Sequence, residues 1–203
     1  WKNLSKSYDC MWDMDLKCST STFYNSSLDA YNNLLRATSQ SMAAILGGAN
    51  TLTVASHNST YENNTDFGDR IAKNIQLVLK EESYFNKVSD PTAGTYYLNE
   101  ITQQLSKNAW DLFKEIEAEG GFIEACRSGF VQANIQVVAD KRIERFNNEE
   151  DVLLGVNKYP NSMETAPESM NHKHNFNDSE EKEFSILRPF RLAQQFELDT
   201  EKV

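Results

Sequence analysis

Two serines are the side chains whose positions in this sequence come nearest to supporting chemistry. Ser21 lies in one predicted strand and Ser56 ends the next, and functional groups of α/β proteins gather where strands end. Neither serine has a base beside it in the sequence, and neither stands in the Gly-x-Ser-x-Gly turn that exposes a nucleophile. Ser21 and Ser56 are therefore kept as candidate substrate contacts, and no catalytic residue is assigned.

The three histidines do not form a predicted metal site. His57 follows the predicted strand at 51–56 as a lone histidine in a polar loop, which is more often a plain surface residue than a functional one. His172 and His174 form a His-Lys-His pair in a stretch without apolar periodicity, where nothing would hold further ligands in place. We therefore expect no metal to be bound.

The glycine and glutamate pairs also indicate structure rather than chemistry. Gly47-Gly48 follows a predicted helix and precedes a strand, whereas a phosphate-binding loop has the opposite order. Glu81-Glu82 and Glu149-Glu150 are adjacent pairs, and adjacent helix positions do not face one another. No phosphate cradle and no general acid–base couple is predicted.

Composition restricts the partners that the chain can have. Its 203 residues suit one domain with a tail, and 39% hydrophobic residues fit a globular protein. The net charge of −10 argues against a nucleic-acid partner, because phosphate binding needs clustered lysine and arginine. No apolar run approaches the roughly 18 residues that span a bilayer. We therefore expect neither nucleic acid nor membrane as a partner.

The cysteines favour a cytoplasmic location. Cys10, Cys18 and Cys126 cannot form a complete disulfide set, and their spacing fits no zinc pattern. They are most simply reduced thiols. The chain begins at Trp1 without a signal-peptide core and without an initiator methionine, so we expect it to be a piece of a longer polypeptide.

Hydrophobic periodicity predicts alternating strands and helices. The predicted strands lie near 16–23, 51–56, 88–98 and 151–156, and the predicted helices near 29–46, 65–82, 99–118 and 130–146. Asp29, Thr65 or Asp66, and Asn99 are expected to open the first three helices, and glycine pairs to close the first and third. This alternation predicts a parallel sheet with covering helices, either doubly wound or part of an eight-fold barrel.

The composition changes at about Asn161. Residues from Met163 to Glu183 are rich in glutamate, asparagine, histidine and serine, and we expect a linker there. Phe184 to Phe196 regains apolar residues and should dock on another part of the protein. The predicted domains are accordingly 1–160 and 161–203.

The order of many short stretches resembles the methylmalonyl-CoA mutase family. The matches run through roughly Thr20 to Pro160: Tyr31-Asn32-Asn33, Arg36, Met42-Ala43-Ala44, Gly47-Gly48, Thr65-Asp66-Phe67, Arg70-Ile71-Ala72, Asn74, Gln76, Glu81-Glu82-Ser83, Val88, Asp90-Pro91, Gly94, Tyr96-Tyr97, Gly120-Gly121, Gly129, Lys141-Arg142 and Gly155-Val156-Asn157-Lys158-Tyr159. The resemblance implies the C-terminal portion of a (β/α)8 TIM-type barrel that binds acyl-CoA. It also implies a separate cobalamin-binding-like domain after residues 161–203.

Two departures from the family pattern bear on activity. Catalytic chains carry a strand resembling Arg-x-His-Cys-Gln-Thr-Ser-Gly-Trp-Ser, and Asp15 stands at its arginine position here. A stretch resembling Ser-Leu-His-Thr-Asn-Ser is replaced by 51–56, which loses its histidine and asparagine and keeps its final serine, Ser56. The resemblance implies adenosylcobalamin as the cofactor of the holoenzyme. Because the cobalamin-ligating pattern Asp-x-His-x-x-Gly is absent from this sequence, we expect no cobalamin to bind to this fragment.

The chain is most like the small, non-catalytic subunit of the family's heterodimers. Arg188-Pro189-Phe190-Arg191 and Gln195-Phe196-Glu197 look like the segment that leads into that subunit's own cobalamin-like domain. The implied role is to support a catalytic large subunit that interconverts methylmalonyl-CoA and succinyl-CoA in propionate metabolism, and the fragment is expected to self-associate. Two alternatives stay open, an active acyl-CoA mutase with divergent substrate residues and an unrelated α/β binding protein.

Overall fold

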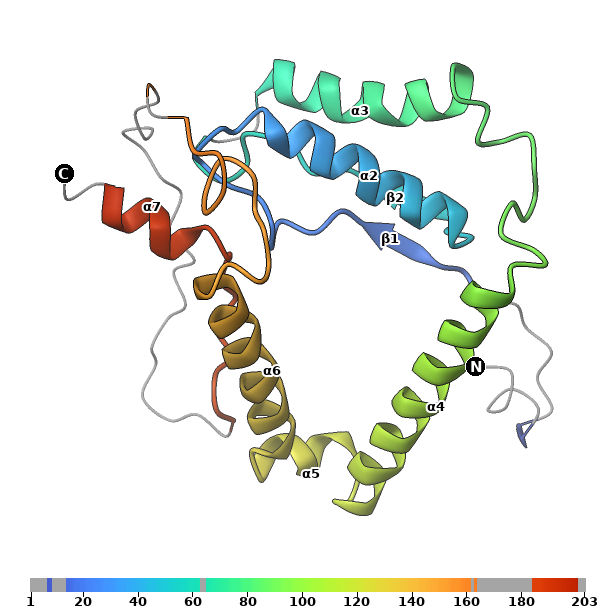
Figure 1. Ribbon diagram of the computed structural model, residues 1–203. Helices are drawn as coiled ribbons and strands as arrows, with labels where there is room; N and C mark the ends of the chain where they lie inside the picture. The colour runs from blue at the N-terminus through green and yellow to red at the C-terminus, as the bar shows by residue number, and fades with distance from the viewer. Residues whose placement is uncertain (1–6, 9–13, 63–64, 162, 164–183, 201–203) are drawn as a thin grey trace.

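A computed structural model describes residues 7–8, 14–62, 65–161, 163 and 184–200, and these residues form eight helices and strands. The strands and helices are β1 (Lys17–Ser19), α2 (Asn32–Leu46), β2 (Thr51–Thr53), α3 (Asp66–Glu81), α4 (Tyr96–Ala118), α5 (Phe122–Arg127), α6 (Phe130–Asn147) and α7 (Gln194–Thr200). β1, β2, α2 and α3 form one body, from which α4, α5 and α6 lead around to α7 (Figure 1).

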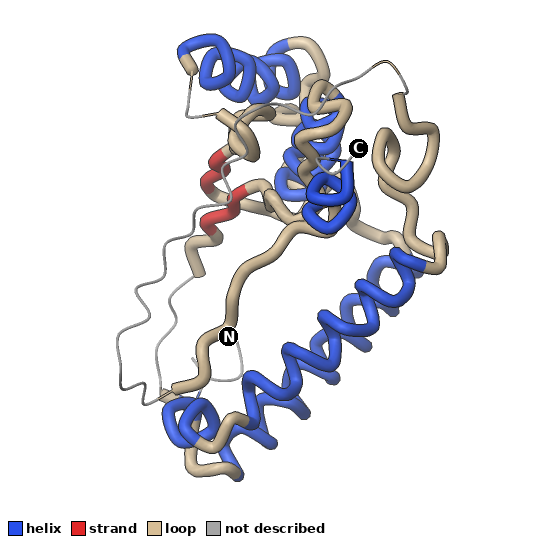
Figure 2. Tube along the Cα trace, turned by 90° about the vertical axis from the view of Figure 1, so that its left-hand side faces the viewer, coloured by secondary structure: helices blue, strands red, loops and turns tan. Residues whose placement is uncertain are grey.

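The two strands pair in parallel, as the predicted β-α-β order requires. Lys17 lies opposite Thr51 and Ser19 opposite Thr53, with α2 as the crossover between the strands. Both strands are shorter than predicted, and Figure 2 shows them as a small sheet beside the helices. The fold class is therefore α/β with a parallel sheet, in which the described residues contribute two strands.

The first hydrophobic core lies between α2 and α3. Ala37 of α2 packs against Ile75 and Leu79 of α3, and partly buried residues close the cluster: Ile45, Val54 and Phe85. The predicted cap of α3 is confirmed, because the Gly68 backbone N–H donates to Thr65 Oγ1 at 3.1 Å. The predicted end of α2 at its glycine pair is confirmed as well.

Asp29 does not cap α2 in the expected way. The helix begins after Tyr31, which makes no side-chain cap hydrogen bond. The Asp29 carboxylate instead accepts a hydrogen bond from Asn32 Nδ2 at 2.6 Å, and Asp29 itself has a positive φ of 46°.

The strand predicted at 88–98 is wrong, because its end is the first turn of α4. The Asp90 turn forms as expected, with the Thr92 backbone N–H donating to Asp90 Oδ1 at 3.1 Å. The helix then begins at Tyr96 rather than Asn99. The strand preference of Tyr96 and Tyr97 is outweighed because the helical spacing of Leu98, Ile101 and Leu105 extends back over them.

The strand predicted at 151–156 is also wrong, and a buried turn takes its place. The Gly155 N–H donates to the Lys158 carbonyl at 2.9 Å, and the Val156 N–H donates to the Leu153 carbonyl at 3.1 Å. Gly155 has a φ of +79°, which interrupts any extended backbone. Two apolar residues of this turn, Leu153 and Val156, are buried in the core, whereas Val152 and Leu154 are about half exposed. The short helix α5 was not predicted.

A second core joins segments that are far apart in the sequence. Its buried members are Phe146, Leu153, Val156, Leu192 and Ala193, and partly buried aromatic rings pack against them: Phe23, Phe190 and Phe196. Residues 190–197 are thus part of the main fold. The linker predicted for Met163 to Glu183 lies outside the described residues, except for Met163.

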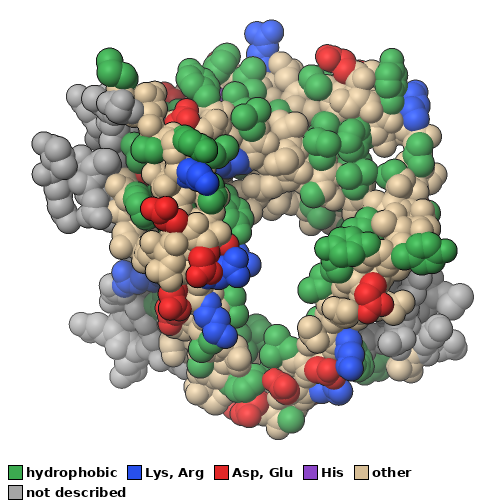
Figure 3. Space-filling model, viewed as in Figure 1, with side chains coloured by type: hydrophobic (Ala, Val, Ile, Leu, Met, Phe, Trp, Pro, Cys, Tyr) green, Lys and Arg blue, Asp and Glu red, His purple; other side chains and the backbone are tan. Residues whose placement is uncertain are grey.

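Helix α4 packs little of its surface against the described residues. None of its side chains is buried, and it exposes large apolar groups along its length: Tyr96, Tyr97, Leu98, Leu105, Trp110, Leu112 and Phe113. Figure 3 shows hydrophobic side chains gathered around an open passage that α4, α5 and α6 border. Within the described ranges, no helix is both long and apolar enough to cross a membrane.

Candidate functional site

The candidate site is the face where β1 and β2 end, which we call the strand-end face and define as loops 20–31 and 54–62. Ligand sites of parallel α/β folds lie at the carboxyl ends of the strands. The two loops are joined directly, because the Thr20 N–H donates to the Thr53 carbonyl at 3.0 Å and the Ala55 N–H donates to Thr20 Oγ1 at 2.8 Å.

Ser21 is held in place by α2. Its backbone N–H donates to Gln40 Oε1 at 2.6 Å, and Gln40 Nε2 donates to its carbonyl at 3.3 Å. Its hydroxyl accepts from the Phe23 N–H at 3.2 Å. The polar groups of Ser21 therefore organise the loop, and its assignment as a substrate contact stays a prediction.

Ser56 faces the protein interior. It is 5% exposed, and its hydroxyl hydrogen-bonds to Asn58 Oδ1. The first turn of α3 covers this pair, because a Cβ added at Gly68 would lie 2.6 Å from Asn58 Oδ1 and would clash with Ser56 Oγ. Ser56 thus packs under a helix, and its role as a substrate contact is likewise untested.

His57 is packed between two aromatic rings. It is 5% exposed, stacked on Tyr31 at a centroid distance of 5.7 Å and edge-on to Phe67 at 6.0 Å. Burial lowers the pKa of His57, and the nearby Glu62 carboxylate only partly opposes this. Among the described residues, Nδ1 has no hydrogen-bond partner. The surface histidine expected from the sequence is instead a buried one.

Asn33 is the residue that sequence reasoning missed, and it links both loops of the strand-end face. Its Oδ1 accepts from the Ser26 N–H at 3.1 Å, while Nδ2 donates to the Ser26 carbonyl at 2.8 Å and to the His57 carbonyl at 2.9 Å. The signal that could have found it is its position four residues before Ala37, on the buried face of α2.

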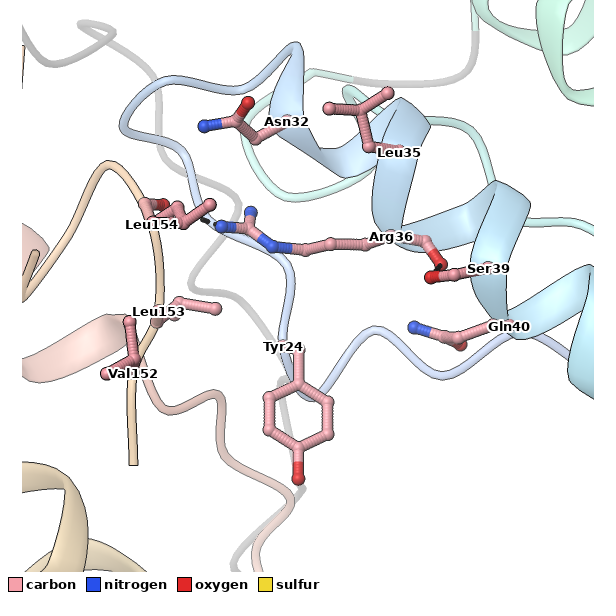
Figure 4. A pocket seen from close by; sticks show the side chains of 9 residues that line it. All are labelled: Tyr24, Asn32, Leu35, Arg36, Ser39, Gln40, Val152, Leu153 and Leu154. Carbon is pink, nitrogen blue, oxygen red and sulfur yellow. Dashed lines mark hydrogen bonds between the residues drawn. The ribbon is translucent and has the colours of Figure 1, made fainter. Parts of the chain in front are cut away.

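Arg36 borders a cavity of about 350 Å³ between α2 and the turn at 152–154. Figure 4 shows its side chain reaching across from α2, with Nη2 donating to the Leu154 carbonyl at 2.7 Å. Nη1 donates to Asn33 Oδ1 at 2.7 Å. Burial lowers the pKa of Arg36, and Asp29 opposes this. The guanidinium thus ties the strand-end face to the turn at 152–154.

The described residues do not assemble a metal site. They contain no group of three or more histidine, cysteine, aspartate or glutamate side chains that could hold an ion. Cys18 and Cys126 are free thiols. His172, His174 and Cys10 lie outside the residues that the structure describes.

Comparison with known proteins assigns the chain to a family. The sequence model of methylmalonyl-CoA mutase matches residues 1–199. The chain belongs to the methylmalonyl-CoA mutase family. The small subunit of methylmalonyl-CoA mutase from Porphyromonas gingivalis is 38% identical over 147 residues, which cover 72% of this chain and 24% of that protein. Methylmalonyl-CoA mutase of Rhizobium meliloti is 39% identical over 142 residues, covering 70% and 20%.

Family membership confirms the resemblance seen in the sequence and excludes an unrelated binding protein. A mitochondrial relative from Bos taurus, also a methylmalonyl-CoA mutase, is 36% identical over 142 residues. The chain spans between 19% and 24% of the length of these three relatives. It therefore corresponds to one section of each of these relatives.

The family is known to use adenosylcobalamin, and the described residues can be tested for a fit to that cofactor. A histidine ligand to cobalt must present an accessible ring nitrogen. His57 does not fit, because it is 5% exposed and enclosed by Tyr31 and Phe67. The described strand-end face therefore offers no cobalt ligand.

Proposed function

We propose that this chain is part of a small-type, non-catalytic mutase subunit. In this proposal residues 1–160 form the C-terminal portion of a β/α barrel, and residues 161–203 lead to a following cobalamin-binding-like domain. The complete subunit supports a catalytic large subunit, which binds adenosylcobalamin and interconverts methylmalonyl-CoA and succinyl-CoA in the cytoplasm.

The state of the strand-end face carries this proposal. Methylmalonyl-CoA and succinyl-CoA each present phosphates, a thioester and a free carboxylate. Recognition of the phosphates and the carboxylate calls for cationic side chains. The hydroxyl-bearing residues at the ends of β1 and β2 carry no positive charge and are bonded within the protein, Thr20 to Ala55, Ser21 to Gln40 and Ser56 to Asn58. Arg36, the cation that borders this face, is engaged by Asn33 and Leu154.

The exposed surface of α4 supports a role in assembly. A 23-residue helix without a buried side chain gains little from tertiary packing, although packing supplies most of the stability of helices in proteins. Exposed apolar patches of this kind mark surfaces that another chain or another section of the same chain covers. The similarity to a protein named as a small subunit favours a heterodimer.

The test uses the full-length polypeptide with and without a catalytic mutase chain from the same organism. Conversion of methylmalonyl-CoA to succinyl-CoA is measured with adenosylcobalamin present, and complex formation is measured by light scattering. We expect no turnover by the full-length polypeptide alone, and a 1:1 complex that turns over when the catalytic chain is added. Turnover by the polypeptide alone at a rate typical of enzymes, above about 1 s⁻¹, would refute the proposal.

An active mutase chain is the second candidate. One observation favours it, because relatives of similar identity from Rhizobium meliloti and Bos taurus carry the name methylmalonyl-CoA mutase without a subunit designation. The same measurement separates the two candidates, since an active chain turns over substrate without a partner.

A further inference from the structure

A buried ion pair fastens the C-terminal segment to the strand-end face. The Glu197 carboxylate is 0% exposed, and Arg191 holds it with two hydrogen bonds, from Nη1 to Oε1 at 2.9 Å and from Nη2 to Oε2 at 2.6 Å. Arg191 Nη1 also donates to the Asn25 carbonyl at 3.0 Å. The pair is thus bonded directly to the loop that follows β1.

The loop after β1 depends on the same carboxylate. The Ser27 backbone N–H donates to Glu197 Oε1 at 2.7 Å, and Ser26 Oγ donates to it at 3.4 Å. One more backbone bond joins the segments, from the Leu192 N–H to the Phe23 carbonyl at 3.1 Å. The Glu197 carboxylate and the Ser27 amide are both buried and cannot hydrogen-bond to water, so each needs a partner within the protein.

The Asn33 links carry the effect of this pair beyond its own loop. Ser26, which contacts Glu197 through its hydroxyl, exchanges two hydrogen bonds with Asn33 through its backbone. Asn33 in turn donates to the His57 carbonyl in the loop after β2. A continuous chain of bonds therefore runs from residue 197 to both loops of the strand-end face.

The apolar contacts of the docked segment, which include the buried Leu192 and Ala193, leave a cavity beside the ion pair. Phe190 packs edge-on against Phe23 and Phe196 against Phe146, with centroid distances of 5.4 and 5.3 Å. Beside these contacts lies an apolar cavity of about 350 Å³, lined by Ile143, Phe146, Phe190, Arg191, Leu192, Gln194 and Gln195. Helix α7 has seven residues, too few to be stable without its docking surface.

We propose that Arg191 and Glu197 form a latch, through which docking of residues 190–197 fixes the loops of the strand-end face. When the segment is docked, the carboxylate holds the Ser27 amide and the loops are ordered. When it undocks, the Ser27 amide loses its acceptor and the loops open together with α7. Any domain that follows residue 203 can thus influence the strand-end face by pulling on or releasing this segment. Arg191 and Glu197 are positioning residues. The latch does not depend on whether the subunit is catalytic.

The wild-type protein tests the latch first, by hydrogen–deuterium exchange and mass spectrometry on the full chain. We expect peptides covering 23–28 and 190–197 to exchange with the same protection factor, below that of α2 and α3, because they open as one unit. Loop protection that differs from that of 190–197 by more than about tenfold would overturn the proposal.

Two variants separate the latch from a general loss of stability. Glu197→Gln should accelerate exchange in both 23–28 and 190–197 by about tenfold or more, with α3 unchanged, because a weaker acceptor then faces the partly buried Arg191. The matched control is Glu117→Gln, an exposed position on α4, which should change neither peptide. Acceleration confined to 190–197, or equal acceleration throughout the protein, would contradict the coupling.

The double variant Arg191→Met/Glu197→Leu replaces both charges with apolar groups of similar volume. Because no unpaired charge remains, we expect residues 190–197 to stay docked. Residues 23–28 should nevertheless exchange faster, since the Ser27 amide has lost its acceptor. Unchanged protection of 23–28 in this variant would show that the loop is ordered without the latch and would refute the proposal.

Discussion

Replacing Gly155 with alanine tests the close approach between the turn at 152–158 and the start of α2. A Cβ added at Gly155 would lie 2.6 Å from Asp29 Cβ, 3.0 Å from Asp29 Oδ2 and 3.3 Å from Asn32 Nδ2. Gly155 also has a φ of +79°, a conformation that costs alanine free energy even in open space.

The structure provides a control that separates these two costs. Gly94 has the same φ of +79°, but a Cβ there meets nothing within 4 Å. Gly94→Ala should therefore lower the free energy of unfolding by about 1–2 kcal/mol, the cost of the left-handed backbone alone. Gly155→Ala adds the overlap with Asp29, and forced overlaps typically cost about 1–3 kcal/mol. The expected loss at Gly155 is thus about 2–5 kcal/mol.

Urea denaturation followed by circular dichroism measures both variants against the wild type. The double variant Asp29→Gly/Gly155→Ala should recover part of the loss, because it removes the Cβ that overlaps and places glycine where φ is 46°. Equal destabilisation by Gly94→Ala and Gly155→Ala would refute the close approach, and so would the absence of any recovery in the double variant.

Three further predictions concern the cores and the strand-end face. Phe146 is 2% exposed, and Phe146→Ala should lower the free energy of unfolding by about 3–5 kcal/mol because it opens a cavity in the second core. Phe122 is 62% exposed, and Phe122→Ala should lower that free energy far less in the same urea titration. Asn33→Ala should destabilise the protein by at least about 2 kcal/mol, because the Ser26 backbone and the His57 carbonyl lose their partners. The control is Asn108→Ala, at an exposed position on α4. Similar losses of stability in the two variants would argue against the Asn33 links. Because burial lowers the pKa of His57 in the folded state, the unfolded chain takes up the proton more readily. The contribution of His57 to the free energy of unfolding should be fully present above about pH 6.5. That contribution should fall as the pH decreases from there through the pKa of His57 in the folded protein. His57→Gln should weaken that dependence between about pH 7.5 and 5.5, and an unchanged slope would contradict the assignment.

The long helices could be predicted because local signals determine them. The bounds of α2, α3 and α6 follow from apolar residues at helical spacing, and the Thr65 cap and the glycines after Leu46 and Ala118 fix three of the ends. The strand errors at 88–98 and 151–156 have a different source. In both cases an apolar or aromatic run was correctly found, but its backbone conformation depends on neighbours that periodicity does not reveal.

The strand-end face was only partly predictable for a similar reason. Its location after β1 and β2 follows from the parallel β-α-β order. The bonds that organise it do not, since Ser27 and Glu197 are separated by 170 residues along the chain. A buried position on α2 marks Asn33 as unusual, but nothing in the sequence indicates that Glu197 would accept a hydrogen bond from the loop after β1.

The second core also sets the order in which this protein can finish folding during its synthesis. Phe146, Leu153 and Val156 are buried together with Leu192 and Ala193. Their apolar surface therefore stays exposed until about 40 more residues have been made, which takes roughly 2–8 s at common rates of translation. The β1–α2–β2–α3 section can pack earlier, because the Ala37, Ile75 and Leu79 core is complete by then. A nascent chain that stalls before residue 190 exposes the apolar surface of Phe146 to chaperones, so residues 190–197 decide whether the second core can close.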